Sequence, residues 1–336
     1  MITPQAPPNI PIDSPNASII ERMTDPEVTN MLQNDHATDF IKKLILGYYV
    51  NKTIQKNEEQ RVVTGVQIID MQSGRPIISH NADEQHFAAS INKLPVVLLI
   101  LEDLRAGRLT MDQTLTWTTT DVRAGAGVYD QPGAPMQAKV KDVIFDLLNR
   151  SGNTAVRVLV NQGLGGAAAV NERWSHIPEL SNTRLQPLDA NRFYVGNSTA
   201  RDSMWVMGKL MERQDSYAKS IKAAMKDNIY SDISVRSQLA GNNYITLVNK
   251  VGLLDDPEGN NRHDTGIIYN TKTKKSYGYS LFTTSPSEDA EATSLAEQSL
   301  KDMGRYTLRF SGDKKVKEGV GLRATDVLQK ESRILY

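Results

Sequence analysis

A serine and a lysine stand three residues apart at Ser90 and Lys93, just before an uncharged apolar run from Leu94 to Leu101. Pro95 fits a helix only near its start, because an interior proline loses a hydrogen bond and clashes with the preceding turn. We therefore predict a buried helix whose entrance places the hydroxyl and the amine on one face. The hydroxyl would lie at the positive end of the helix dipole, where a neighbouring lysine can take its proton. The alternative is that Ser90 caps a core helix while Lys93 extends to solvent.

Two further short motifs follow at Ser151-Gly-Asn153 and Lys250-Val-Gly252. The first falls between two expected helices and the second on an expected strand. Taken singly, the first is compatible with a helix break and cap, and the second with a solvated strand lysine. Their order along the chain therefore carries more information than either motif alone.

The composition excludes several classes of chemistry. The 336-residue chain has no cysteine, which excludes disulfides, thiolate metal sites and a cysteine nucleophile. Its five histidines lack metal-ligand spacing, so we expect neither a metal nor another cofactor. The formal net charge of zero predicts no general affinity for nucleic acid. No apolar run is long enough to span a bilayer, and the N-terminus lacks the features of a signal peptide.

The N-terminal part predicts a tail, helices and a hairpin. Residues 1–17 contain five of the 14 prolines and little to bury, so we expect an extended tail or linker. Residues 18–60 have helical periodicity. Residues 61–70 and 75–80 are strand-like and flank a Ser-Gly turn. Residues 110–138 form a long Thr-, Gly- and Pro-rich loop, which in a compact domain is usually functional.

Helices and then strands are expected in the rest of the chain. The predicted helices cover residues 140–149, 155–162, 167–174, 201–212 and 287–303, with further helix after residue 212 to about residue 230. The predicted strands cover residues 244–252, 265–270 and 276–284. Residues 304–336 have no clear assignment.

These elements predict an α/β (α+β) protein with a five-stranded antiparallel sheet flanked by helices and an inserted all-helical subdomain. We expect a single catalytic domain at residues 18–336. Its sheet subdomain would comprise residues 18–88 and 230–336, and its helical subdomain residues 89–229.

The three motifs in this order resemble those of the penicillin-recognising serine enzymes: class A β-lactamases, D,D-peptidases and penicillin-binding proteins. They are S-x-x-K at Ser90, S-x-N at Ser151 and K-x-G at Lys250. The resemblance covers roughly residues 40–303 and includes Arg262-His-Asp-Thr-Gly-Ile-Ile268 after the third motif. It implies the β-lactamase/transpeptidase fold and acyl transfer through a serine.

The resemblance implies a role for each motif residue. Ser90 would be the nucleophile and Lys93 its activating base. A neutral Lys93 requires a pKa about 3 units below the usual value of about 10.4, roughly 4 kcal/mol of differential interaction. Lys250 would supply a second cation that helps lower this pKa. Ser151 would relay the proton to the leaving nitrogen, and Asn153 would hold the amide side chain of the substrate.

The remaining substrate site is also expected around the serine. The backbone N–H groups of Ser90 and of Leu253, just after Gly252, would form the oxyanion hole. Tyr129, in the Gly-rich loop, is a further substrate-binding candidate. Val251 stands where the family usually has a hydroxyl for the substrate carboxylate, which removes a hydrogen bond worth about 1.5–3 kcal/mol. The candidates to replace this donor are Arg236, Arg262 and His263.

Other departures from the class A pattern concern the S-x-N motif and the deacylation step. Gly152 stands where class A enzymes have Asp, and the S-G-N form is similar to certain D,D-carboxypeptidases. An ungapped overlay places Asp189 at the position of the glutamate that activates the deacylating water, and Phe193 at the position of its partner asparagine. Asp189 is one methylene shorter, and Phe193 cannot bind a water. Two interpretations of Asp189 therefore stay open: it is either a catalytic residue or a loop carboxylate on the surface.

The leading hypothesis is a class A β-lactamase-like serine hydrolase that opens a β-lactam or a related D-Ala-D-Ala amide, with slow deacylation. The alternatives are a D,D-carboxypeptidase or transpeptidase acting on peptidoglycan stem peptides, and a non-catalytic sensor with the same fold. The two enzyme hypotheses imply a small-molecule β-lactam or peptidoglycan peptide as substrate, outside the cytoplasm. We therefore expect an extracytoplasmic location, whether secreted, periplasmic or membrane-anchored.

Overall fold

A computed structural model describes residues 23–33, 39–186, 196–226, 228–230, 234–239 and 243–312. The predicted tail at residues 1–17 lies outside the described residues. So do residues 313–336 and the loop segment with Asp189 and Phe193.

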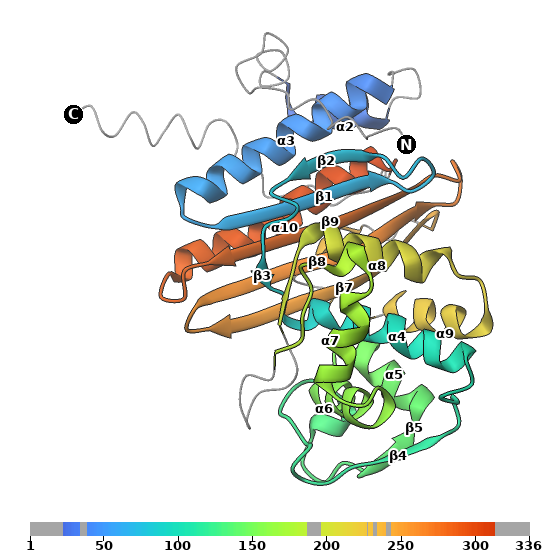
Figure 1. Ribbon diagram of the computed structural model, residues 1–336. Coiled ribbons are helices and arrows are strands. Elements are labelled where there is room, and N and C mark those ends of the chain that lie inside the picture. The colour runs from blue at the N-terminus through green and yellow to red at the C-terminus, as the bar shows by residue number, and fades with distance from the viewer. Residues whose placement is uncertain are drawn as a thin grey trace.

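The predicted five-stranded antiparallel sheet is confirmed, in the order β2-β1-β9-β8-β7. The strands are β1 (Val63–Asp70), β2 (Pro76–His80), β7 (Ile245–Asp256), β8 (Gly259–Asn270) and β9 (Ser276–Ser285). The N-terminal hairpin joins the C-terminal meander where β1 pairs with β9. The two ends of the chain therefore build one sheet, and β7 lies at its edge (Figure 1).

Helices from both ends of the chain and from its middle surround the sheet. The terminal helices are α2 (Asp25–Gln33), α3 (Asp39–Glu59) and α10 (Ala290–Phe310). The helices between β2 and β7 are α4 (Lys93–Arg105), α5 (Val140–Asn149), α6 (Asn153–Val158), α7 (Ala167–Ser175), α8 (Ala200–Glu212) and α9 (Ser216–Lys226).

Short elements connect these helices. They are the helical turns η1 (Ala89–Asn92), η2 (Val128–Asp130), η3 (Leu159–Gly163), η4 (Pro178–Leu180) and η5 (Val235–Gln238) and the strands β3 (His86–Phe87), β4 (Thr114–Thr116), β5 (Gln137–Lys139) and β6 (Asn197–Ser198). The small strands pair as β3 with β6 and β4 with β5. The loop predicted at residues 110–138 thus contains β4, η2 and most of β5.

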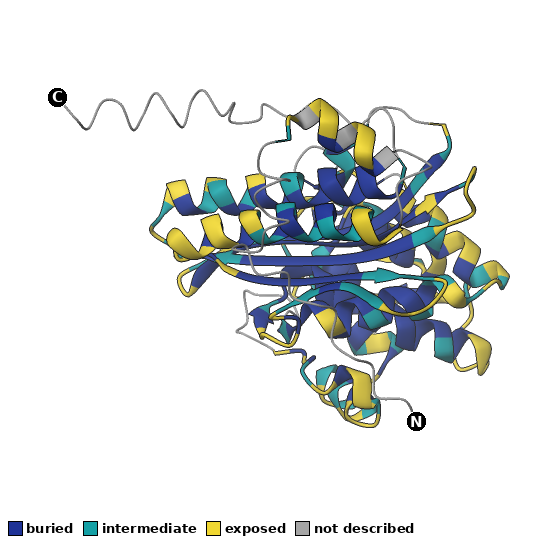
Figure 2. Ribbon diagram, turned by 90° about the horizontal axis from the view of Figure 1, so that it is seen from above, coloured by how far each residue is buried: buried dark blue, intermediate teal, exposed yellow. Residues whose placement is uncertain are grey.

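Alternate residues of the sheet belong to two separate apolar cores. Leu247 and Ile268 pack in the core that contains α3 and α10. Their neighbours Val248 and Ile267 pack in the core that contains α4–α9, because successive strand side chains point to opposite faces. In Figure 2 the buried strands lie between helices whose exposed residues face outward. The even-numbered residues of β7, including Lys250, therefore point toward α4–α9.

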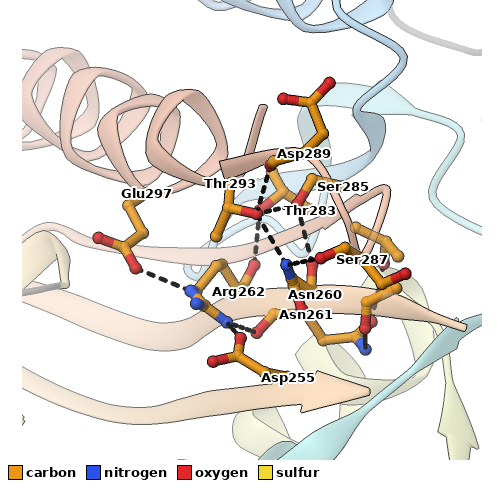
Figure 3. Close-up of polar contacts among 12 residues, drawn as sticks. Asp255, Asn260, Asn261, Arg262, Thr283, Ser285, Ser287, Asp289, Thr293 and Glu297 are labelled. Atoms are coloured by element: carbon orange, nitrogen blue, oxygen red, sulfur yellow. Dashed lines mark hydrogen bonds and ion pairs between the residues drawn. The ribbon is translucent and has the colours of Figure 1, made fainter. Parts of the chain in front are cut away.

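Strand β8 is longer than predicted because polar side chains fill its first half. Residues 260–264 are all buried, and their polarity hides the strand pattern. Figure 3 shows that two of these residues, Asn260 and Arg262, find partners on α10. Asn260 donates to Thr293 Oγ1 at 2.9 Å, and Arg262 Nε donates to Glu297 Oε1 at 2.8 Å.

The last helix is also longer than predicted. The sequence-based helix ended at Met303, directly before Gly304, whereas α10 continues to Phe310. A Cβ at Gly304 would lie 2.5 Å from Val235 Cγ2, so the glycine provides room for η5 against the helix. Gly304 is a packing residue here and not a helix stop.

Candidate active site

Ser90 lies in η1, a single 3₁₀ turn that leads directly into α4 at Lys93. Pro95 is the third residue of α4, where a missing N–H is tolerated. Ala89 has a φ of +48°, an unusual backbone conformation that costs on the order of 1–3 kcal/mol for a residue with a Cβ. The strained turn and the helix together determine where the Ser90 hydroxyl points.

The Lys93 side chain is buried among oxygens of the first two motifs. Its Nζ lies 3.0 Å from Ser90 Oγ, 3.1 Å from Ser151 Oγ and 2.6 Å from the Ser151 carbonyl oxygen. It also donates to Asn153 Oδ1 at 2.9 Å. Only 1% of Lys93 is exposed, so the amine is held beside the Ser90 hydroxyl and does not extend to solvent.

Lys250 completes the hydrogen-bonded group from the edge strand. Its Nζ donates to Ser151 Oγ at 2.8 Å and to the Val251 carbonyl oxygen at 2.8 Å. It also lies 6.0 Å from the ring centroid of Tyr230, within cation–π range. Ser151 Oγ is therefore shared by two lysines, and a continuous chain runs from Ser90 through Lys93 and Ser151 to Lys250.

Burial depresses the pKa of both lysines. It lowers the pKa of Lys93 from 10.5 to about 7, while the negative charges of Asp130 and Asp146 oppose this shift. Burial lowers the pKa of Lys250 well below its usual value, and the charge of Lys93 adds to the effect. A lysine with a pKa near 7 has a large neutral fraction at neutral pH and can accept the Ser90 proton.

Asp130 ties the Gly-rich loop to the second motif. Its carboxylate accepts hydrogen bonds from the backbone N–H groups of Gly127 at 2.9 Å, Asn153 at 3.0 Å and Thr154 at 2.8 Å. Asn153 Nδ2 donates to the Ala124 carbonyl oxygen at 2.7 Å. The predicted long loop thus lies directly against the S-x-N motif and supplies a carboxylate near Lys93.

A second carboxylate comes from Asp146, on the buried face of α5. Its Oδ1 accepts from the Val128 N–H at 2.7 Å. Sequence reasoning missed both Asp130 and Asp146. One signal could have identified Asp146: it lies between the apolar positions Ile144 and Leu147 on the face of the helix that is expected to be buried. A charged residue is almost never fully buried unless it is paired, so an aspartate there indicates a specific partner.

Gly252 brings the edge strand close to the serine turn. A Cβ at this position would lie 2.9 Å from Ile91 Cγ1 and 3.0 Å from the Ala88 carbonyl oxygen. The glycine therefore permits a backbone approach that a side chain would prevent. Leu253 follows in the same edge strand, near the turn that holds Ser90.

Two of the expected substrate-binding residues lie on the other face of the sheet. Val251 and Arg262 alternate with the residues that face α4–α9, and Arg262 instead contacts Glu297 of α10 and, at 2.7 Å, Asp255 (Figure 3). Arg236 donates to the Leu247 carbonyl oxygen at 2.9 Å. The structure therefore does not bring the side chains of Val251, Arg236 and Arg262 together with Lys250.

The two remaining candidates contact other parts of the chain near the site. His263 is on the same face as Lys250, but it is fully buried, and its Nε2 lies 3.0 Å from the Phe87 carbonyl oxygen. The Tyr129 ring packs edge-on against Trp117, with centroids 5.2 Å apart. The position of Asp189 lies outside the described residues.

The described part of the chain contains neither a metal site nor a membrane-spanning helix. No group of three or more His, Cys, Asp or Glu side chains there is placed to hold a metal ion. None of the helices in the described ranges is long and apolar enough to cross a bilayer.

Comparison with solved structures shows the fold. A variant of PBP-A, described as an acyl-enzyme complex with penicillin G, superposes with a TM-score of 0.66 at 19% identity, covering 77% of this chain and 96% of that one. A β-lactamase from Sphaerobacter thermophilus gives a TM-score of 0.65 at 20% identity over 78% and 97% of the two chains. The chromosome-encoded β-lactamase of Vibrio parahaemolyticus gives 0.64 at 20% identity over 77% and 97%.

Comparison at the sequence level adds the family. No curated protein matches the chain. A family model described as "Beta-lactamase enzyme family" matches residues 46–302, which include Ser90, Lys93, Ser151 and Lys250. This match covers well over half of the chain and agrees with the serine–lysine arrangement and the sheet topology. The chain belongs to the beta-lactamase enzyme family.

Proposed function

We propose that the protein is a class A β-lactamase-like serine hydrolase that opens a β-lactam or a related D-Ala-D-Ala amide through an acyl-Ser90 intermediate. The observation that carries this proposal is the hydrogen-bonded chain Ser90–Lys93–Ser151–Lys250 with a Lys93 pKa near 7. It provides a nucleophile, a base and a route for the proton within one buried cluster.

In the acylation step, Lys93 Nζ takes the proton of the Ser90 hydroxyl while Ser90 Oγ bonds to the carbonyl carbon. Negative charge then develops on the carbonyl oxygen, where the backbone N–H groups of Ser90 and Leu253 would stabilise it. As the C–N bond breaks, the nitrogen receives a proton from Ser151, which is replenished by Lys93. The products of this step are an ester at Ser90 and an amine, which remains attached to the acyl group when a β-lactam ring opens and leaves when the substrate is a peptide.

Deacylation requires a water molecule and a base to cleave this ester. We propose that this step is slow, because Asp189 and Phe193 stand at the positions of the glutamate and asparagine that bind the water in class A enzymes. The ester would then outlive the first turnover.

The alternative reaction is that of a D,D-carboxypeptidase or transpeptidase acting on peptidoglycan stem peptides. The S-G-N form of the second motif favours it, and the same cluster would catalyse its acylation step. A non-catalytic sensor is the third possibility. It would bind penicillin reversibly and leave Ser90 unmodified. Because either ligand class is found outside the cytoplasm, we propose an extracytoplasmic location.

The deciding experiment is intact mass spectrometry after mixing with benzylpenicillin, followed over time for the wild type and for Ser90→Ala. We expect the wild type to gain the mass of one benzylpenicillin and to lose it over minutes to hours, while Ser90→Ala gains nothing. Release of D-Ala from a D-Ala-D-Ala peptide, together with a stable penicillin adduct, would favour the peptidase. Loss of the adduct within seconds would contradict slow deacylation, and absence of any adduct would contradict the enzyme proposal.

A further inference from the structure

Asp146 is a buried carboxylate with half of its hydrogen-bonding capacity unused. Its side chain comes from α5 and is 2% exposed. One oxygen accepts from the Val128 N–H, whereas Oδ2 has no hydrogen-bond partner among the described residues. A buried polar atom in this state is costly, so its position calls for an explanation.

Glycines of the loop and of the second motif make room for this carboxylate. A Cβ on Gly127 would lie 2.6 Å from Asp146 Oδ2, and a Cβ on Gly152 would overlap the same oxygen. Gly152 has φ −52° and ψ 127°, a conformation open to any residue. Its lack of a side chain is therefore explained by space and not by backbone geometry.

The carboxylate thus occupies the volume that a side chain at position 152 would fill. This is the position where class A enzymes carry an aspartate, between the serine and the asparagine of the motif. Here the chain places an aspartate on the preceding helix, and its carboxylate lies against Gly152 while holding the loop through Val128. Lys93 contacts the residues on both sides of Gly152, Ser151 and Asn153.

We propose that Asp146 is a positioning residue that supplies from α5 the carboxylate missing at position 152, holding the Gly-rich loop and the S-G-N motif around Lys93. This inference rests on the proposed function for its catalytic consequence, but its structural part can be tested without any substrate. Asp146 touches neither Ser90 nor a reacting atom in this arrangement and acts through its neighbours.

The charges around Asp146 determine how its removal would affect Lys93. Burial raises the pKa of Asp146, and the charge of Asp130 on η2 adds to the increase. The hydrogen bond from Val128 N–H and the charges of Arg150, just after α5, and of Lys93 on α4 oppose it. In turn, the charges of Asp130 and Asp146 raise the pKa of Lys93 against its burial. Loss of the Asp146 charge therefore lowers the pKa of Lys93.

The structural test is a thermal-unfolding cycle with Asp146→Ala, Gly152→Asp and the double variant. Each single change should lower Tm by roughly 5 °C, the first by leaving the Val128 N–H unpaired and the second by overlap and like-charge repulsion. In the double variant the new side chain at position 152 enters the vacated volume, and the nearest remaining neighbour of its Cβ is Ala155 Cβ, at 3.1 Å. We expect its Tm to recover to within about 2 °C of the wild type.

The functional test is the pH dependence of benzylpenicillin acylation for Asp146→Asn. The acylation rate of this variant should rise with pH as in the wild type, but the midpoint of the rise should lie about half a pH unit lower. The reason is that the neutral amide no longer stabilises the Lys93 ammonium. A purely structural role would lower the rate without moving this profile. Asp142→Asn is the matched control, since Asp142 is exposed one turn earlier on α5 and should leave both Tm and the profile unchanged.

Additive losses of Tm in the cycle would overturn the inference, as would an unmoved pH profile in Asp146→Asn. Failure of the proposed function can be told apart from failure of this inference. If the wild type formed no penicillin adduct, the proposed function would fail, but the Tm of the double variant would still recover.

Discussion

At the scale of single residues, the chemistry depends on the burial of Lys93. An ammonium in water holds its proton far above neutral pH, but this one is enclosed by protein and has a pKa of about 7. The four oxygens around Nζ outnumber the three protons of an ammonium. When Lys93 is neutral, its lone pair can accept the proton of the Ser90 hydroxyl.

The low pKa of Lys93 predicts how the acylation rate depends on pH. Acylation requires neutral Lys93, so the rate of adduct formation with benzylpenicillin should rise with pH and level off above about pH 7. The sign follows from burial, which disfavours the charged form and moves the lysine pKa downward. Stopped-flow or quenched mass spectrometry between pH 5 and 9 would measure it. A rate that is independent of pH over this range would show that Lys93 is not the base.

At the scale of elements, the site exists because β7 lies directly against η1. The strand carries Lys250 on the face toward α4–α9, and its edge position leaves the backbone near Ser90 without a neighbouring strand. The interface has no room for a side chain at Gly252. The separation of strand and turn therefore controls both the lysine position and the proposed oxyanion donor at Leu253.

Gly252→Ala tests this spacing. The new Cβ would lie 3.0 Å or less from Ile91 Cγ1 and the Ala88 carbonyl oxygen, so the strand and the turn must separate. We expect acylation to slow by about 10–100-fold, because small misplacements of reacting groups are costly. Gly208→Ala in α8 is the control. Its Cβ would meet only Met71, at 3.8 Å, and Ala favours helix, so acylation should stay at the wild-type rate. Equal rates for both variants would contradict the proposed spacing.

At the scale of the whole molecule, the sheet separates the face that carries the candidate active site from a structural face. Arg262 belongs to the structural face, where it links β8 to Glu297 of α10 and to Asp255 of β7. Asp264, beside it, is also buried there and accepts hydrogen bonds from Val235 N–H and Asn249. These polar contacts hold the edge of the sheet and α10 together.

Arg262→Met should therefore affect stability and not catalysis. Its two ion-pair partners are partly exposed, which limits their contribution, and we expect a loss of about 1–2 kcal/mol in the free energy of unfolding. Acylation by benzylpenicillin should stay within about twofold of the wild type. Urea unfolding and the adduct assay would measure the two effects, with the exposed Lys209→Ala as the control for loss of a surface ion pair. A selective loss of penicillin affinity would instead place Arg262 in substrate binding.

Local patterns were sufficient for much of the fold. Alternating and β-branched residues located the five strands, and apolar periodicity located the helices, including α5 at its observed bounds. Prediction was weakest where tertiary contacts override local preference. Asn260 and Arg262 of β8 are paired with side chains of α10, and Gly304 lies inside α10 where Val235 leaves no room for a side chain.

The sequence by itself determined which groups are available for chemistry: a serine and a lysine one turn apart, followed in order by S-G-N and K-V-G. Motif order carries this information because each motif falls at a junction between elements. Only the tertiary structure decided that Lys93 and Lys250 share Ser151 Oγ, that Arg262 faces away, and that Asp146 fills the space beside Gly152. The physical reason is that pKa values, strand faces and close contacts depend on burial and on neighbours that are distant along the chain.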